Sequence, residues 1–94
     1  MKEALVETRL KTKVEEAGGY IRKAQWIGRR GAPDRWVGFP STKRAAWVEL
    51  KRPKTPEAEA HQAREHKRMR DCGEIVLVIA NYADVDRFVR EMMS

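Results

Sequence analysis

The sequence predicts a single α/β domain spanning residues 1–94, with helices packed on a mixed β-sheet. Apolar residues recur at helical spacing near both ends of the chain. Residues 45–51 alternate with the period of two of a half-buried strand. Residues 55–72 form a helix of crossover length that leads into a continuous apolar run. The expected order is therefore helix, three strands, helix, strand, helix.

Residues 2–17 are expected to form the first helix, because Val6, Leu10, Val14 and Ala17 share one helical face and Gly18-Gly19 follows. Residues 20–27 are predicted to form a strand, with Tyr20, Arg22, Ala24 and Trp26 on one face. Residues 28–31 are a glycine-bounded turn, and Pro33 prevents a helix from starting there.

Residues 35–39 are predicted to form a second strand, joined to the strand at 45–51 by the polar connection 40–44. On the third strand the alternation divides the side chains into two sets. Ala46, Val48 and Leu50 form the expected core face. The opposite set is Ala45, Trp47, Glu49 and Lys51, which begins apolar and ends with two charges. A purely structural strand rarely needs that arrangement.

The second helix is expected to start at Thr55-Pro56, a capping hydroxyl followed by proline, and to end before Gly73. The apolar run at 74–80 is typical of a strand covered on both faces, parallel to an earlier strand. Asn81 is expected to cap a last helix. The apolar stripe of this helix is Val85, Phe88, Val89 and Met92.

Positive charge is concentrated in the middle of the chain. The net charge is +6, but residues 22–70 contain 14 basic and 5 acidic residues, whereas the two flanks together are net acidic. This distribution favours a polyanionic partner such as nucleic acid, with a solvated basic face as the alternative. The single Cys72 excludes an internal disulfide and a multi-cysteine zinc site. With no apolar run of membrane-spanning length and no signal peptide, we expect a cytoplasmic protein.

The residues most indicative of chemistry are Asp34, which opens the second strand, and Glu49 with Lys51, which close the third. Neighbouring strands joined by a short connection would bring the two carboxylates to one divalent cation, and hard cations such as Mg²⁺ prefer oxygen ligands. Lys51 would point to the same side as Glu49 and assist the attacking water or stabilise the developing anion. With its side chain in the core, Leu50 would offer its backbone carbonyl as a further ligand.

Each of these features is common by itself. A Glu-x-Lys pair on a strand is usually a solvent-exposed ion pair, and Asp after proline is frequent in turns. His61 and His66 lack the spacing of a helical metal pair, and Trp26, Trp36 and Trp47 are mostly expected in the core or at an interface. Only the order of Asp34, Glu49 and Lys51, within the most basic part of the chain, indicates a site.

The segments GAPDRWVGF, AAWVELKRP and HQAREHKRMRDCGEIVLVI resemble the VRR-NUC family of the PD-(D/E)XK nuclease superfamily, nearly along the whole chain. The resemblance implies a restriction-endonuclease-like αβββαβ core, dependence on Mg²⁺ or Mn²⁺, and cleavage of DNA. The motif aspartate falls on Asp34, and the glutamate-x-lysine motif on Glu49 and Lys51. The family's Val-Arg-Arg signature corresponds here to Val48-Glu49-Leu50, a departure that leaves the acidic ligands intact.

The resemblance also implies roles for Glu7, as a third metal ligand or a holder of metal-bound water, and for Gln62, as a residue that supports the site or positions phosphate. The alternative for Glu7 is a surface pair with Lys11. Seven basic residues flank the predicted site in sequence and are candidate phosphate ligands. They are Arg29, Arg30, Arg35, Lys43, Arg44, Arg52 and Lys54.

Minimal stand-alone members of the family resemble Holliday-junction resolvases, and their compact size is typical of phage genomes. The resemblance thus favours a homodimer that cuts four-way DNA junctions, since two symmetric cuts need two sites related by a twofold axis. Two alternatives stay open. One is a nuclease that acts on flaps, nicks or duplex ends, and the other is a non-catalytic DNA-binding subunit.

Overall fold

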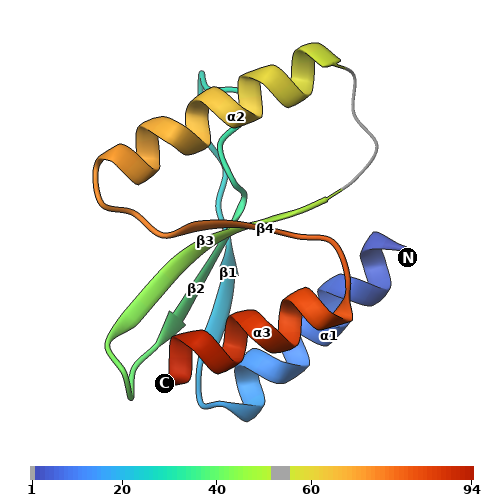
Figure 1. Cartoon of the computed structure of the whole chain (residues 1–94), viewed down its shortest axis with the longest axis vertical. Coiled ribbons are helices and arrows are strands. Elements are labelled where there is room, and N and C mark those ends of the chain that lie inside the picture. Colours follow the sequence, from blue (N-terminus) through green and yellow to red (C-terminus); the bar gives the residue numbers. More distant parts are fainter. Residues whose placement is uncertain (1, 52–55) are drawn as a thin grey trace.

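A computed structural model describes residues 2–51 and 56–94 of the chain (Figure 1). The elements are α1 (Glu3–Glu16), β1 (Tyr20–Lys23), β2 (Arg35–Phe39), β3 (Arg44–Leu50), α2 (Pro56–Asp71), β4 (Val76–Ile79) and α3 (Tyr82–Met93). Their order and type confirm the order expected from the sequence. Thr55, the expected cap of the second helix, lies outside the described residues.

The four strands form one mixed sheet in the order β1-β2-β3-β4. The first three strands are antiparallel to one another, and β4 is parallel to β3. The parallel pair follows from α2, which carries the chain back across the sheet between β3 and β4. Gly73, at φ +91°, ends the α2 segment as predicted, because glycine adopts this left-handed conformation without a steric penalty.

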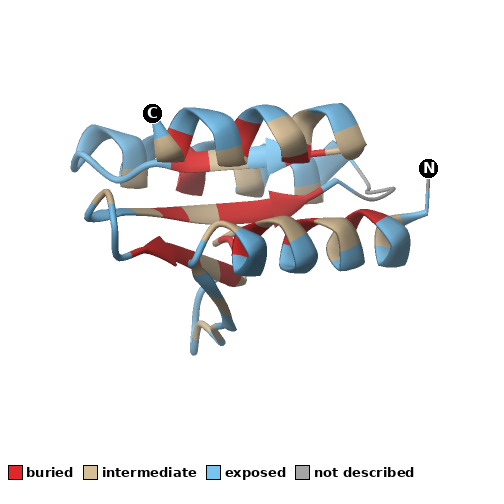
Figure 2. Cartoon of the chain, turned by 90° about the horizontal axis from the view of Figure 1, so that it is seen from below, coloured by how far each residue is buried: buried red, intermediate tan, exposed pale blue. Residues whose placement is uncertain are grey.

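Helices α1 and α3 lie side by side on one side of the sheet, with α2 on the other side (Figure 1). The core forms between the sheet and the pair α1 and α3, and Figure 2 shows buried residues along the strands between the helices. The strands contribute Val37, Ala46, Val48 and Leu50 to it, while the helices contribute the predicted stripes Val6, Leu10, Val14 and Val85, Phe88, Met92. Asn81 caps α3 by accepting a 2.8 Å hydrogen bond from the Asp84 backbone N–H.

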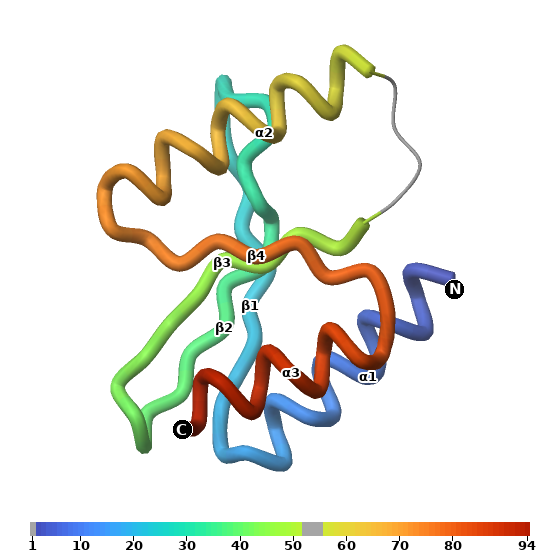
Figure 3. The backbone as a smooth tube through the Cα atoms, in the orientation of Figure 1, coloured from blue at the N-terminus to red at the C-terminus, as the bar shows by residue number. Residues whose placement is uncertain are grey.

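The predicted strand 20–27 is too long, because β1 ends at Lys23. After one more pairing bond, from the Ala24 N–H to the Asp34 carbonyl at 2.8 Å, the chain leaves the sheet and forms an excursion over residues 25–33. The tube in Figure 3 shows this segment next to α2. Trp26 nevertheless stays on the predicted face, since its ring centroid lies 5.2 Å from that of Trp47 on β3.

The prediction that residues 74–80 are covered on both faces is confirmed only in part. Strand β4 is the last strand of the sheet, and the side chains of Ile75 and Val78 are 41% and 45% exposed. Val76 and Ile79 are buried. By strand alternation Val76 and Ile79 lie on opposite faces, so each face of β4 has a buried residue, while the edge position leaves Ile75 and Val78 exposed. Sequence periodicity cannot distinguish this from a central strand.

Candidate active site

Asp34 and Glu49 come from adjacent strands that run in opposite directions. The register pairs Arg35 with Val48 at the end of the ladder, and continuing it by one residue would set Asp34 opposite Glu49. The hydrogen bond from Ala24 to the Asp34 carbonyl shows that Asp34 is still held as part of the sheet. Directly opposed residues of antiparallel strands have Cβ atoms about 4.5–5.5 Å apart. Asp34 and Glu49 thus adjoin the last paired residues of β2 and β3.

Lys51 follows the end of β3, where the strand geometry persists. Its backbone N–H donates to the Ile79 carbonyl at 2.8 Å, as a further rung of the β3–β4 ladder. By strand alternation the Lys51 side chain, which is exposed, lies on the same side as that of Glu49, which is buried. The Leu50 side chain between them is 1% exposed and belongs to the core, as predicted.

Trp26 ties the Asp34 segment to the sheet. Its indole N–H donates to the carbonyl of Pro33 at 2.7 Å, and its ring packs on Trp47, two residues before Glu49. Pro33 itself is fully buried. This positioning role was missed by sequence reasoning, because nothing in the spacing of three tryptophans indicates which one folds back on the site.

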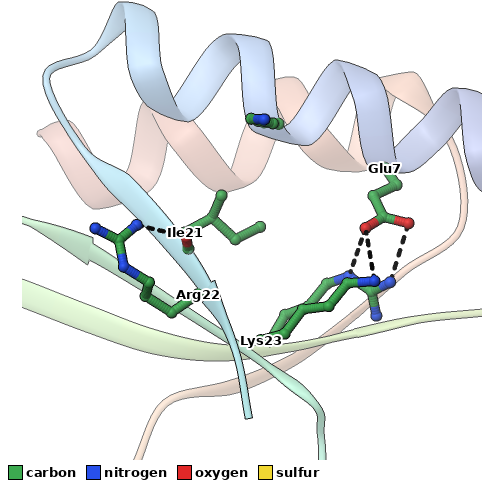
Figure 4. A pocket seen from close by; sticks show the side chains of 6 residues that line it. Glu7, Ile21, Arg22 and Lys23 are labelled. Carbon is green, nitrogen blue, oxygen red and sulfur yellow. Dashed lines mark hydrogen bonds and ion pairs between the residues drawn. The ribbon is translucent and has the colours of Figure 1, made fainter.

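Glu7 on α1 binds the buried guanidinium of Arg35. Glu7 Oε2 lies 3.0 Å from Arg35 Nη2, and Glu7 Oε1 lies 3.3 Å from Arg35 Nε. Figure 4 shows Glu7 pointing from α1 toward Lys23, whose Nζ lies 3.9 Å from Oε1. Asp34 Oδ1 binds Nη1 of the same Arg35 at 2.6 Å. One guanidinium therefore lies between Asp34 and Glu7, and it connects the first helix to the predicted site.

The structure corrects the predicted role of Arg35 as a surface phosphate ligand. Its side chain is 5% exposed and is bonded to both carboxylates, so it is an internal counter-charge. The partners of Glu7 are Arg35 and Lys23 instead of the alternative, Lys11. Within residues 2–51 and 56–94, no three His, Cys, Asp or Glu side chains are grouped as metal ligands, so Glu7 does not join Asp34 and Glu49 in such a group.

The donor atoms at Asp34 and Glu49 suit a hard divalent cation. Both residues supply carboxylate oxygens, and Mg²⁺ sites in proteins typically use one or two carboxylates, with waters and substrate phosphate completing the shell. The carboxylates of Asp34 and Glu49, with the backbone carbonyl of Leu50 next in sequence, would fit that pattern without a third acidic side chain. The residues present are thus compatible with the ion that the family resemblance implies.

Two of the predicted phosphate ligands lie far from this site. Lys43 is in the turn between β2 and β3, and Arg44 at the start of β3 donates to the Glu91 carbonyl at 2.9 Å. Asp34 is at the other end of the same hairpin, about five residues or roughly 17 Å along the strand. Neighbourhood in sequence was misleading because a hairpin separates its turn from its open end. Arg52 and Lys54 lie outside the described residues.

Arg29 and Arg30 lie in the excursion that contacts α2. Both are exposed, and Arg29 Nη2 binds Glu65 Oε1 on α2 at 2.9 Å. The hydrogen bond from Arg29, together with that from Arg68, holds the pKa of the Glu65 carboxyl below its usual value, against the opposing effect of burial. Gln62 is half-buried on the same helix, with its Cα beside Gly31. His66 is buried, consistent with a packing residue.

The chain is similar to known proteins in sequence and in fold. No family model matches the chain. Among curated proteins it is 37% identical over 79 residues to "Putative nuclease p44" of Acyrthosiphon pisum secondary endosymbiont phage 1, covering 84% of this chain and 83% of that protein. A solved structure described as "VRR_NUC domain" superposes with a TM-score of 0.80 at 35% identity and covers 94% of both chains.

The described residues contain no helix that is long and apolar enough to cross a membrane. The mixed sheet with its three helices is the architecture expected of a PD-(D/E)XK core, and both comparisons extend over more than four fifths of the chain. On the strength of this shared sequence and shared fold, the chain belongs to the VRR-NUC family and is a nuclease.

Proposed function

We propose that this nuclease is a divalent-metal-dependent DNA endonuclease centred on Asp34, Glu49 and Lys51. The observation that supports this most strongly is the register of β2 and β3, which, continued by one residue, would set Asp34 opposite Glu49. Lys51 follows on the same side of the strand that carries Glu49. Two carboxylates and one amine suit metal-assisted hydrolysis of a phosphodiester, in which a bound cation activates water and offsets phosphate charge.

Asp34, Glu49 and the Leu50 carbonyl would hold Mg²⁺ or Mn²⁺. When bound, such an ion lowers the pKa of water and offsets negative charge on the phosphate. Lys51 orients the attacking water or stabilises the charge that develops on the phosphate oxygens. Burial of Glu49 at 4% exposure strengthens its attraction for a cation, because little water competes for its oxygens.

Glu7 and Gln62 have supporting roles in this proposal. Glu7 orients Asp34 through Arg35, with both contacts at hydrogen-bond distance. A direct part for Glu7 in holding metal-bound water would require Arg35 to move. Gln62 lies on the face of α2 that meets the excursion preceding Asp34, where it would support that segment or position a phosphate.

The proposed substrate is a four-way DNA junction, cut by a homodimer. The chain is small, with principal extents of 36, 31 and 21 Å. One turn of B-DNA is about 34–36 Å long, so one copy covers about one turn and cannot enclose a branched substrate. Two copies related by a twofold axis would present two equivalent sites to two symmetric strands. The rival substrates are flaps, nicks and duplex ends.

The test is a cleavage assay with Mg²⁺ or Mn²⁺ on a labelled four-way junction, a flap and a linear duplex of matched sequence. The parent protein is expected to cut the junction preferentially. Lys51→Ala is expected to lower the rate about 10²–10⁴-fold, as for loss of a proton-transfer or charge-stabilising group. Asp34→Asn is expected to lose activity and to bind the metal more weakly, which calorimetric titration with Mn²⁺ measures.

Arg87→Ala, on α3 at the other side of the sheet, is the control for loss of a basic side chain and is expected to cut like the parent. Equal cutting of junction, flap and duplex would reject the resolvase specificity and leave the nuclease chemistry in place. Full activity of both Lys51→Ala and Asp34→Asn would overturn the assignment of the site. A parent that binds DNA and cuts nothing would instead favour the non-catalytic alternative.

A further inference from the structure

A hollow lined by arginines lies between the excursion and α2. Its lining residues are Arg29, Arg30, His61, Arg64, Glu65 and Arg68, which we call the arginine hollow. Its volume is about 310 Å³. This volume is large enough for a phosphate group with part of its hydration shell. The sequence analysis did not assign Arg64 or Arg68 to any site.

Four guanidinium groups face a single carboxylate in the arginine hollow, so it carries a formal charge of +3 when His61 is neutral. Glu65 Oε1 accepts from Arg29 at 2.9 Å and from Arg68 at 3.1 Å. The Glu65 side chain is only 10% exposed, whereas those of Arg29 and Arg68 are 51% and 62% exposed. The buried Glu65 carboxylate therefore fixes the guanidinium groups of Arg29 and Arg68, and both groups remain accessible to a ligand.

Gly31 explains how the two segments come this close. It adopts φ +78°, and a Cβ built on it would lie 2.7 Å from the backbone carbon and oxygen of His61. Only a residue without a side chain fits there, so the backbone of the excursion packs directly against the backbone of α2. As a result Arg29 and Arg30, just before Gly31, meet Arg64 and Arg68, one and two turns beyond His61 on α2.

We propose that the arginine hollow binds a backbone phosphate of the DNA substrate away from the bond that is cut. This inference rests on the proposed function, which supplies DNA as the ligand. Guanidinium groups offer planar, forked donors that match phosphate oxygens, and all the described residues that line the hollow are polar or charged. An anionic phosphate therefore fits the hollow better than an apolar segment of a protein partner.

The position of the hollow agrees with a phosphate close to the active site. Arg30 precedes Asp34 by four residues, so their Cα atoms are at most about 14 Å apart. Phosphates of one DNA strand repeat about every 3.4 Å along the helix axis. The contacted phosphate is thus expected within about four steps of the cut bond, before the reach of the arginine side chain is added.

The test is the salt dependence of DNA binding, measured by fluorescence anisotropy with a labelled duplex and a labelled junction in EDTA, where no cleavage occurs. Arg64→Ala/Arg68→Ala is expected to bind both DNAs more weakly than the parent. The slope of log Kd against log salt concentration is expected to fall by about 2, roughly one for each arginine that no longer binds a phosphate.

The matched control is Arg87→Ala/Arg90→Ala, which removes the same charge from α3 and is expected to retain the parent slope. Arg30→Ala/Arg64→Ala leaves both ion pairs of Glu65 intact. It replaces Arg64→Ala/Arg68→Ala in the binding assay if circular dichroism shows that the latter does not fold. Arg64→Lys/Arg68→Lys keeps the positive charge but loses the paired N–H donors of the guanidinium groups. This variant is expected to retain most of the parent's salt-dependence slope but only part of its DNA affinity.

Binding by the hollow variants that equals that of the parent, or of the α3 control, would overturn the proposal. If Asp34→Asn abolishes cleavage while the hollow variants bind normally, the active-site assignment stands and only the arginine hollow is wrong. If the hollow variants lose binding while Asp34→Asn and Lys51→Ala still cut, the hollow is a DNA site and the proposed catalytic centre is wrong.

Discussion

Arg35 is the residue whose role depends most on its surroundings. Its guanidinium is nearly excluded from water, and an unpaired charge in that position would be strongly destabilising. Glu7 and Asp34 both neutralise it, so the carboxylate proposed to bind metal also has a structural partner. Arg35 thus couples the orientation of Asp34 to the position of α1.

Removing the charge of Glu7 is therefore expected to lower stability. Glu7→Gln leaves Asp34 as the carboxylate that neutralises Arg35. Because the Glu7 side chain is about one third exposed, we expect a loss of about 1–2 kcal/mol, below the 3–5 kcal/mol typical of a fully buried pair. Urea unfolding at pH 7 measures the change.

Glu16→Gln is the matched control on the same helix, because Glu16 is 61% exposed and pairs with Lys13 at 3.5 Å. It is expected to change stability by less than about 0.5 kcal/mol. Equal effects of the two substitutions would show that Arg35 does not depend on Glu7.

At the scale of elements, the contact between the excursion and α2 depends on Gly31. Gly31→Ala is expected to destabilise the fold, since alanine at positive φ costs about 1–2 kcal/mol and the clash with the His61 backbone adds about 1–3 kcal/mol. DNA affinity should fall with it, because the two halves of the arginine hollow separate.

Gly28→Ala provides the control for backbone strain alone. Gly28 has φ +74°, but a Cβ there would meet nothing within 4 Å. Its loss of stability in urea unfolding should therefore be limited to the strain of about 1–2 kcal/mol. Similar losses for the two variants would contradict the close approach at Gly31.

Helices α1 and α3 are joined by an ion pair whose effect depends on pH. Arg9 binds both carboxylate oxygens of Asp86, at 3.2 and 2.8 Å. The hydrogen bond from Arg9 holds the pKa of Asp86 below its usual value, although burial opposes this. The folded state thus favours the ionised form. The stabilisation is complete above the ordinary aspartate pKa of about 3.9 and is lost as the pH falls through the lower folded value.

Asp86→Asn is therefore expected to lower the thermal midpoint at neutral pH, with a difference from the parent that shrinks below about pH 3.9. Thermal unfolding followed by circular dichroism over a pH series measures this difference. Asp71→Asn, which removes an exposed i,i+4 pair with Lys67, is the control for a surface carboxylate. A difference that stays constant with pH would mean that the Arg9–Asp86 pair contributes nothing.

At the scale of the whole molecule, the proposed homodimer makes a prediction about strand cleavage. Parent protein mixed with an excess of Lys51→Ala should form mixed dimers with one competent site. On a four-way junction these dimers should release nicked products instead of paired cuts, as resolved on native and denaturing gels. Sedimentation velocity of the parent is expected to give twice the mass of the chain.

Lys43→Ala, at the far end of the β2–β3 hairpin, is the control for mixing, and its mixtures should continue to give paired cuts. Paired cuts that persist at high excess of the Lys51→Ala protein would argue against a dimer with one site per copy. A monomer that cuts one strand at a time would favour flaps, nicks or duplex ends as the substrate.

The sequence by itself determined most of the local structure and the order of the elements. The stripe of Val6, Leu10 and Val14, the alternation along β3 and the cap at Asn81 are all periodic or adjacent features, which depend on a residue and its near neighbours. The family motif also identified Asp34, Glu49 and Lys51 as candidates. Their catalytic roles remain predictions.

Only the tertiary structure decided which distant segments meet. Burial of Arg35 between Asp34 and Glu7, the separation of Arg44 from the site, the exposed edge of β4 and the arginine hollow all depend on contacts between residues far apart in the sequence. Periodicity states which side of an element is apolar, but not what packs against it. A basic residue near a motif therefore becomes an internal counter-charge, a distant surface group or a phosphate ligand according to the packing of the chain around it.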